Sequence, residues 1–383
     1  MKGAQALSQK STIGRRGFIK LGADAGAMIA GAGTWIETAL NAHQAAAQDS
    51  AAGWELRPRG TSRPVSIDVH AHWAPEGYVN AERELGRPSP GDPIPLRADL
   101  DKRLKWMDEH GVQMLVLTLS GGMPWQWVSP QTGARLAQIV NDAGVEACTA
   151  FPDRFTGAIE IPAHDPALSL KELNRMAGKP GMRALHLPTT IEGREYLFEP
   201  SFAPVFARCE ELGYPLLFHP LDGDVNFYGG PKNRVSDPLL DQVRYWNTLG
   251  FPFETATMAT KFIINGTLDK YPRLEIVLPH SGGCFPYLAG RVGHGLTRKK
   301  FPLQRPFREY IRRFYYDTMT YDLESLRFLI NLVGSDRVVV GTDNGFGTRQ
   351  NFEWPNAIIE HLNLQAADED LILRGNAKKL LRL

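Results

Sequence analysis

The sequence predicts a (β/α)₈ barrel, also called a TIM barrel, over residues 65–383, and three observations lead to this fold class. The chain has 383 residues, which is enough for one barrel-sized domain with a large core. Eight short apolar, β-branched segments alternate with segments of helical spacing. The strand segments are nearly continuous hydrophobic runs, which is typical of parallel strands buried on both faces. This alternation favours a closed barrel.

The predicted strands are separated by predicted helices, several of which end at glycine, as at Gly111 and Gly213, where a C-cap is expected. The helices include Leu100–His110, Gly133–Ala147, Ala167–Met176, Phe202–Leu212, Thr255–Lys270 and Leu323–Leu332. The strands are Val65–His70, Met114–Leu119, Phe155–Ile161, Met182–Leu187, Pro215–His219, Glu275–His280, Phe314–Asp317 and Val338–Asp343.

The alternative fold is an open, doubly wound sheet. No glycine-rich phosphate loop follows the first predicted strand, which weakens this alternative. The segment Leu221–Phe253 has no clear strand pattern. It is long enough to be a loop insertion after the fifth strand, beside the active site.

Composition and charge exclude some classes of protein. The net charge is +1 and no dense Lys/Arg block is present, so nucleic acid is not an expected partner. The three cysteines, Cys148, Cys209 and Cys284, are odd in number and far apart. They suggest neither a disulfide framework nor a thiolate metal site.

The N-terminus has the pattern of a targeting segment. Residues 11–20 read STIGRRGFIK, and a weakly hydrophobic Ala/Gly-rich stretch and the small residues Ala45-x-Ala47 follow. A basic start, an apolar middle and a small-residue exit indicate a secretory signal. The paired Arg15 and Arg16 resemble the twin-arginine export signal of bacteria.

We therefore expect residues 1–47 to be a twin-arginine signal peptide and residues 48–64 to be a linker or N-terminal arm. The mature barrel is then expected to be periplasmic. The apolar stretch is too interrupted to span a membrane, so we expect no membrane span in the mature chain.

Polar residues with metal-binding side chains fall at the ends of four predicted strands, where barrel enzymes build their sites. The first strand ends in DVHAH, and residues two apart on a strand point to the same side. Both histidines of this pair can therefore face one ion. The residues at the four strand ends are His70, His72, His219, His280 and Asp343.

Three neutral imidazoles and one carboxylate make a site that suits Zn²⁺, with Mn²⁺, Fe²⁺ or Co²⁺ as alternatives. We expect one divalent ion per chain, which would lower the pKa of a bound water to about 7. A single strand-end histidine is weak evidence, because histidine is often a satisfied core residue. The metal prediction depends on independent strands that each end in such a residue.

From about Val65 to Leu383 the chain resembles the amidohydrolase superfamily, and within it the 2-amino-3-carboxymuconate-6-semialdehyde decarboxylase family. The resemblance covers nearly the whole predicted mature chain, in the right order. The matching stretches are IDVHAHWAP, KRLKWMDEHGVQ, FHP, GFPFET, LPHSGGCFPYLAGRVGHG, FYYDTMTYDLESLRFLINLVGSDRVVVGTDNGF and GNAKKLL.

The resemblance implies roles for the strand-end residues. His70, His72, His219 and Asp343 match the positions that hold the single divalent metal, which is usually zinc. His280 matches a histidine that acts as the general acid/base, a role that suits an imidazole near neutral pH. Asp343 is a second candidate for moving protons.

The resemblance also implies substrate contacts. Arg103 matches an arginine that grips the substrate carboxylate, and Arg291 one that reaches the site of the partner in a homodimer. The planar guanidinium fork of arginine suits both tasks. Trp246 and Phe346 are further candidates for the substrate pocket. Relatives commonly carry Tyr-Pro where this chain has Asn344-Gly345, a departure that we expect to face the substrate.

These residues favour nonoxidative decarboxylation of a small unsaturated or aromatic carboxylic acid, with no organic cofactor. The alternative on the same site is metal-dependent hydrolysis of a lactone, an ester, an amide or a C–C bond. A third class, an exported metal-binding protein without catalysis, is disfavoured by the acid/base histidine beside a complete ligand set.

Overall fold

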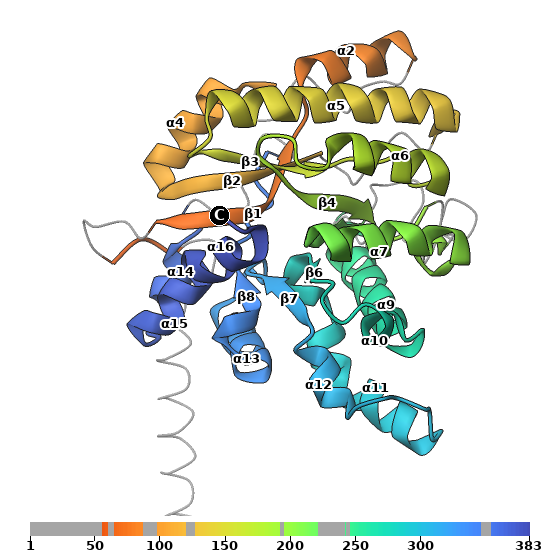
Figure 1. The fold of residues 1–383 in the computed structure, drawn as a ribbon. Coiled ribbons are helices and arrows are strands. Elements are labelled where there is room, and N and C mark those ends of the chain that lie inside the picture. Colours follow the sequence, from red (N-terminus) through yellow and green to blue (C-terminus); the bar gives the residue numbers. More distant parts are fainter. Residues whose placement is uncertain are drawn as a thin grey trace, which may run out of the picture. The chain divides into compact units, whose positions relative to one another are not determined.

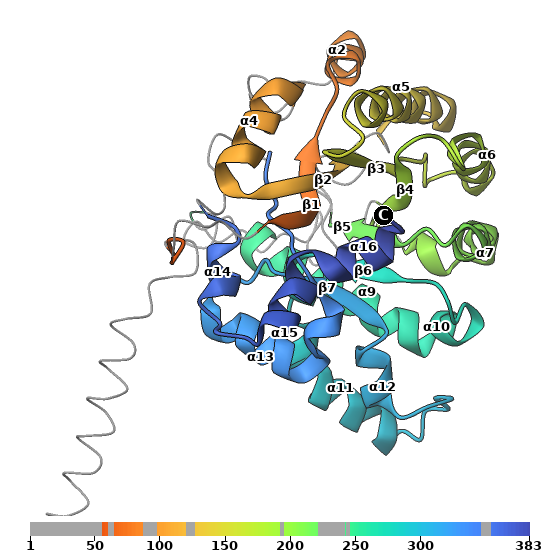
Figure 2. The same ribbon diagram turned by 60° about the vertical axis from the view of Figure 1, so that its left-hand side comes forward.

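Eight parallel strands follow one another around a sheet in chain order, as the sequence predicts (Figures 1 and 2). In this computed structural model, Asp68 and Ala71 of the first strand also pair with Val340 and Asn344 beyond the last strand, which closes the barrel. The strands are β1 Ser66–Trp73, β2 Val112–Leu119, β3 Phe155–Ile159, β4 Met182–Pro188, β5 Leu216–His219, β6 Ile276–Leu278, β7 Phe314–Asp317 and β8 Val338–Val339.

The structure describes residues 56–59, 65–86, 98–119, 127–191, 195–220, 242, 246–345 and 354–383. The predicted signal peptide over residues 1–47 lies outside this part of the chain. Most of the predicted insertion Leu221–Phe253 does as well, and its last residues form helical turns that lead into α9. Within the described ranges, no helix is both long enough and apolar enough to cross a membrane.

Helices follow most of the strands, and α5, α6 and α7 lie outside β3, β4 and β5 (Figure 2). Asp99 caps the N-terminus of α4 by accepting from the backbone N–H of Lys102, and Gly111 ends α4 in the left-handed conformation. The longer helices are α2 Glu76–Glu84, α4 Leu100–His110, α5 Pro130–Ala150, α6 Pro166–Met176, α7 Ala203–Leu212, α9 Phe251–Ile264, α11 Phe285–Arg298 and α13 Leu323–Val333. The shorter ones are α10 Thr267–Lys270, α12 Phe307–Ile311, α14 Ala357–Glu360, α15 Ala366–Asp370 and α16 Asn376–Leu381.

The hydrophobic core has two layers. The larger cluster lies between the strands and the surrounding helices. The smaller cluster fills the barrel interior with one or two side chains from each strand, including Ile67 and Val69 of β1. Leu380 and Leu381 of α16 pack into this interior cluster, so the C-terminal helix plugs the barrel. The interior is therefore a packed core and not a pore.

A β-bulge in β1 directs both histidines of the first strand into the barrel. Asp68 pairs with Leu115 but Ala71 pairs with Leu117, so β1 carries one extra residue between these pairs. Ile67 and Val69 face the interior, and strict alternation after them would send His70 and His72 to the helix side. The extra residue reverses the alternation, as bulges beside active sites often do.

Two predicted strands are shorter than expected. β6 ends at Leu278, because Pro279 has no backbone N–H to donate and His280 has a φ of +52°. β8 ends at Val339, and Asp343 has a φ of +53°. Because both strands end early, His280 and Asp343 lie in turns beyond them. The prediction that these two residues lie within strands was therefore wrong.

Candidate metal centre

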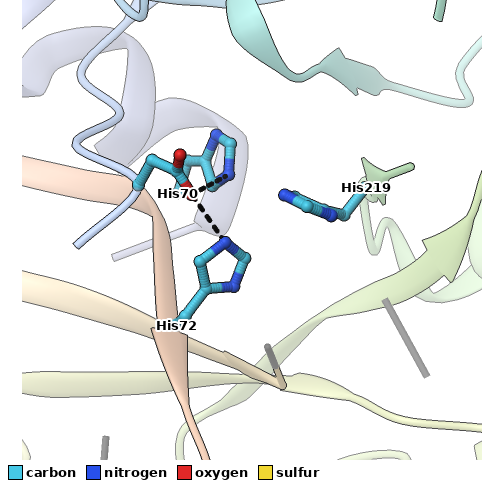
Figure 3. Close-up of side chains that lie close together, drawn as sticks. His70, His72 and His219 are labelled. Carbon is cyan, nitrogen blue, oxygen red and sulfur yellow. Dashed lines mark hydrogen bonds and ion pairs between the residues drawn. The ribbon is translucent and has the colours of Figure 1, made fainter. Parts of the chain in front are cut away.

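The four predicted metal ligands come together at the carboxyl ends of β1, β5 and β8. Ligand atoms of His70, His72, His219 and Asp343 all lie within 4.8 Å of one another, in the only such cluster within the described ranges. His70 and His72 come from β1, and His219 reaches them from β5 (Figure 3). Oδ1 of Asp343 lies 2.7 Å from Nε2 of His72 and 3.5 Å from Nε2 of His70.

The second ring nitrogen of two ligands is fixed by a hydrogen bond. Nδ1 of His70 lies 2.6 Å from Oδ2 of Asp317, and Nδ1 of His219 lies 2.6 Å from the carbonyl oxygen of Pro220. Each imidazole therefore donates at Nδ1, and the neutral form of each ring leaves Nε2 available for an ion. Three imidazole nitrogens and a carboxylate fit a divalent metal of the zinc or manganese type.

The ionisation of these groups follows from burial and from the two carboxylates. Burial lowers the pKa of His72, and it lowers the pKa of His219 well below its usual value. Burial also opposes a charge on His70, but hydrogen bonds to Asp317 and Asp343 raise its pKa to about 10. Burial would raise the pKa of Asp343, yet hydrogen bonds from His70 and His72 hold it well below its usual range.

His280 lies beside the ligands but outside the ligand cluster. Its ring centroid is 5.2 Å from that of His70 and 5.3 Å from that of His219, and its ring stacks at 17° on Phe251, the first residue of α9. Burial, followed by the nearby His70, lowers its pKa to about 4. A neutral imidazole in this position can accept or relay a proton.

A cavity of about 430 Å³ opens onto this centre. His280 and Asp343 form part of its wall, together with Tyr321 from the turn after β7 and Ser325 of α13. This volume suits a small organic ligand. The two groups expected to move protons therefore face the same space.

Arg103 contacts the backbone of one predicted metal ligand, His72. Its side chain is fully buried, and Nη2 donates a 2.5 Å hydrogen bond to the carbonyl oxygen of His72. Arg103 thus supports the end of β1, while its predicted contact with a substrate carboxylate stays a prediction.

Asn344 and Gly345, which stand where relatives commonly carry Tyr-Pro, face β1 and not the substrate cavity. The expectation that these two residues face the substrate was therefore wrong. Asn344 is buried, and its carbonyl oxygen accepts from the backbone N–H of His72 at 2.6 Å. Gly345 has a φ of +97°, and a Cβ there would lie 2.1 Å from the carbonyl oxygen of His72. Only glycine allows this close approach.

Of the three other predicted substrate residues, only Arg291 has a side chain that the structure describes. Arg291 is exposed on α11. Trp246 begins the helical turn Trp246–Gly250 before α9, and its side chain lies outside the described part of the structure. Phe346 lies outside it as well.

Two buried aspartates that support the centre were not predicted. Asp317 ends β7 and accepts from His70 and from the backbone N–H groups of His280 and Ser281. Asp68 accepts from the backbone N–H of His70 and from the hydroxyl of Thr342, which joins β1 to the turn that carries Asp343. A signal was present for both, since Asp68 stands between the apolar residues Ile67 and Val69, and Asp317 directly follows the aromatic run 314–316.

The fold and the ligand set together define a metal-dependent barrel enzyme of the amidohydrolase type. A match to the amidohydrolase family covers residues 67–383, so the chain belongs to this family. The family prediction is thereby confirmed.

Two relatives are decarboxylases. The chain is 28% identical to 2-amino-3-carboxymuconate-6-semialdehyde decarboxylase of Dictyostelium discoideum, over 84% of this chain and 92% of that protein. It is 29% identical to gamma-resorcylate decarboxylase of a Rhizobium strain, over 74% of this chain and 87% of that protein.

A solved structure has the same fold. The crystal structure of 5-carboxyvanillate decarboxylase from Novosphingobium aromaticivorans, complexed with manganese and 4-hydroxy-3-methoxy-5-nitrobenzoic acid, matches with a TM-score of 0.70. The identity is 24%, and the match covers 86% of this chain and 99% of that one. This similarity supports the barrel fold.

Proposed function

We propose that this protein is a divalent-metal-dependent, nonoxidative decarboxylase of a small aromatic or unsaturated carboxylic acid. The observation that carries the proposal is the cavity whose wall contains both His280 and Asp343, beside a complete set of metal ligands. The family membership and the two decarboxylase relatives support the reaction type.

The chain's own residues supply the proton movement. In decarboxylation the bond between the carboxylate carbon and the ring carbon breaks, its electron pair stays on the ring carbon, and CO₂ leaves. The ring carbon takes one proton in its place. His280 and Asp343 face the cavity and are the groups that relay this proton from solvent. A divalent ion, when bound, supplies Lewis-acid chemistry that orients the substrate.

His70, His72, His219 and Asp343 would hold the ion. The donor set is three imidazole nitrogens and one carboxylate, for which we propose Zn²⁺, with Mn²⁺ as the main competitor. Mn²⁺ is included because the 5-carboxyvanillate decarboxylase structure contains manganese. Reconstitution with each metal separately, followed by the same activity assay, distinguishes them.

A substrate screen tests the reaction type. Metal-loaded protein is incubated with aromatic and unsaturated carboxylic acids, lactones and esters, and CO₂ release and acid release are read in parallel. The proposal expects CO₂ from at least one carboxylic acid. Turnover of lactones or esters without CO₂ from any acid would instead establish the hydrolase alternative.

We also propose that residues 1–47 export the folded enzyme to the periplasm by the twin-arginine route. The RRGFIK motif followed by an Ala/Gly-rich stretch supports this proposal. Fractionation of cells that express the full chain tests it, with Arg15→Lys/Arg16→Lys as the export-defective comparison. Equal amounts of both proteins in the periplasm would rule it out.

We further propose a homodimer in which Arg291 completes the partner's site. The exposure of Arg291 on α11 leaves its guanidinium accessible to another chain. Mixing two inactive variants, Arg291→Ala and His72→Ala, tests this sharing. Random pairing should restore about a quarter of the wild-type activity, because half of the dimers then contain one intact site. No recovery in a mixture shown to form mixed dimers would contradict it.

A further inference from the structure

Strained backbone conformations gather around the cavity. Seven non-glycine residues in the described part of the chain have a positive φ, and four of them line this one cavity. The four are His280, Ser281, Tyr321 and Asp343, with φ between +52° and +56°. Such conformations are costly for residues with a Cβ and are concentrated at functional sites.

Three of the four already have an assigned role. Asp343 is a predicted metal ligand and His280 the predicted acid/base. Ser281 donates both its backbone N–H and its hydroxyl to Asp317. Tyr321 is the remaining member of the set, and nothing in the reaction described so far explains its conformation.

The turn that carries Tyr321 is held from both sides. The hydroxyl of Thr320 donates a 2.8 Å hydrogen bond to the carbonyl oxygen of Asp322. The side chain of Asp322 accepts from the backbone N–H of Ser325 at 2.7 Å and thereby caps the N-terminus of α13. These contacts hold the backbone of the turn on both sides of Tyr321, which lines the cavity.

We propose that Tyr321 binds substrate, and that its phenol hydroxyl donates a hydrogen bond to a hydroxyl group on the ring of the bound acid. This inference rests on the proposed decarboxylase function. It adds a specificity-determining residue that the sequence did not indicate.

The chemistry of the surrounding wall favours a ring hydroxyl over a second anionic group. Thr320, Ser325 and Asn247 supply neutral polar groups, and none of the described lining residues is lysine or arginine. Burial, with the charges of Asp343 and Asp317, raises the pKa of Tyr321, so its hydroxyl stays protonated as a donor. A neutral hydroxyl on the ligand can accept this hydrogen bond without a compensating cation.

The test compares benzoate with its 2-, 3- and 4-hydroxy derivatives. Dissociation constants are measured by calorimetry on manganese-loaded wild type and Tyr321→Phe, which removes only the hydroxyl. The wild type should bind at least one hydroxybenzoate more tightly than benzoate, and the variant should lose about 3- to 10-fold of that preference. Benzoate itself should bind both proteins equally.

Tyr214→Phe is the matched control, because Tyr214 lies before β5 and its hydroxyl accepts from the backbone N–H of Gly178, away from the cavity lining. It should keep the full preference. The proposal is overturned if Tyr321→Phe keeps the preference, or if the wild type has none. Since binding needs no turnover, this outcome is separate from a failure to release CO₂.

Discussion

Asp317 and His70 form the contact that orients the metal centre, with Oδ2 of the carboxylate 2.6 Å from Nδ1 of the ring. The same carboxylate accepts the backbone N–H of His280 at 2.9 Å. One residue at the end of β7 therefore positions both a metal ligand and the predicted acid/base. Contacts of this kind fix the tautomer and the direction of a metal-binding imidazole.

Asp317→Asn should weaken metal binding by about 10- to 100-fold while the barrel still folds, because the amide is a poorer acceptor for the imidazole. Metal titration and circular dichroism measure the two properties. Asp336→Asn is the control, since Asp336 pairs with Arg312 on the surface. Equal metal affinity in wild type and Asp317→Asn would refute the orienting role.

Gly345→Ala should destabilise the protein by about 3 kcal/mol or more, because its Cβ would overlap the carbonyl oxygen of His72 and its φ of +97° is strained for alanine. Gly178→Ala is the control, since Gly178 has a φ of +75° and no atom within 4 Å of its Cβ position. That variant should lose only about 1–2 kcal/mol. Denaturant unfolding measures both, and equal losses would contradict the close approach.

Metal binding at neutral pH should release a proton from His70. Its pKa is raised to about 10, so the metal-free site holds an imidazolium whose stabilising contact with the carboxylates is lost only as the pH rises through about 10. An ion needs the neutral ring, so its apparent affinity should rise with pH toward that value. Calorimetry in buffers of different ionisation enthalpy measures the release. Binding enthalpies that do not depend on the buffer would contradict it.

His280→Gln should lower kcat by about 10²- to 10⁴-fold and leave the metal content unchanged, because His280 lies outside the ligand cluster and faces the cavity. Activity and elemental analysis on the same preparation provide both readouts. If the metal content fell in proportion to the activity, His280 would instead be a metal ligand. His294→Ala, an exposed histidine of α11, controls for loss of a histidine elsewhere.

The sequence was informative about the fold because its signals are local. Continuous apolar runs predicted all eight strands. The glycines after α4 and α7 have the left-handed conformation expected of C-caps. Strand ends also indicated the ligand set, because a barrel brings all carboxyl ends of its strands to one face. His70, His72, His219 and Asp343 meet there as predicted.

Other features depend on long-range contacts that no local pattern encodes. The bulge in β1 depends on pairing with β2, and the role of Asp317 depends on β7 lying opposite His70. The close approach of Gly345 to the carbonyl oxygen of His72 joins residues that are 273 positions apart, so no pattern around Gly345 predicts it. Tyr321 was missed because its positive φ is a property of the folded turn.

The central claim is that the metal held by His70, His72, His219 and Asp343 is required for decarboxylation. The most direct measurement is CO₂ release from an acid identified in the screen, before and after chelation and after addition of one equivalent of Zn²⁺ or Mn²⁺. We predict that chelation abolishes CO₂ release, that the metal restores it in wild type, and that His72→Ala does not recover. Full activity after complete metal removal, or in His72→Ala without bound metal, would contradict the account.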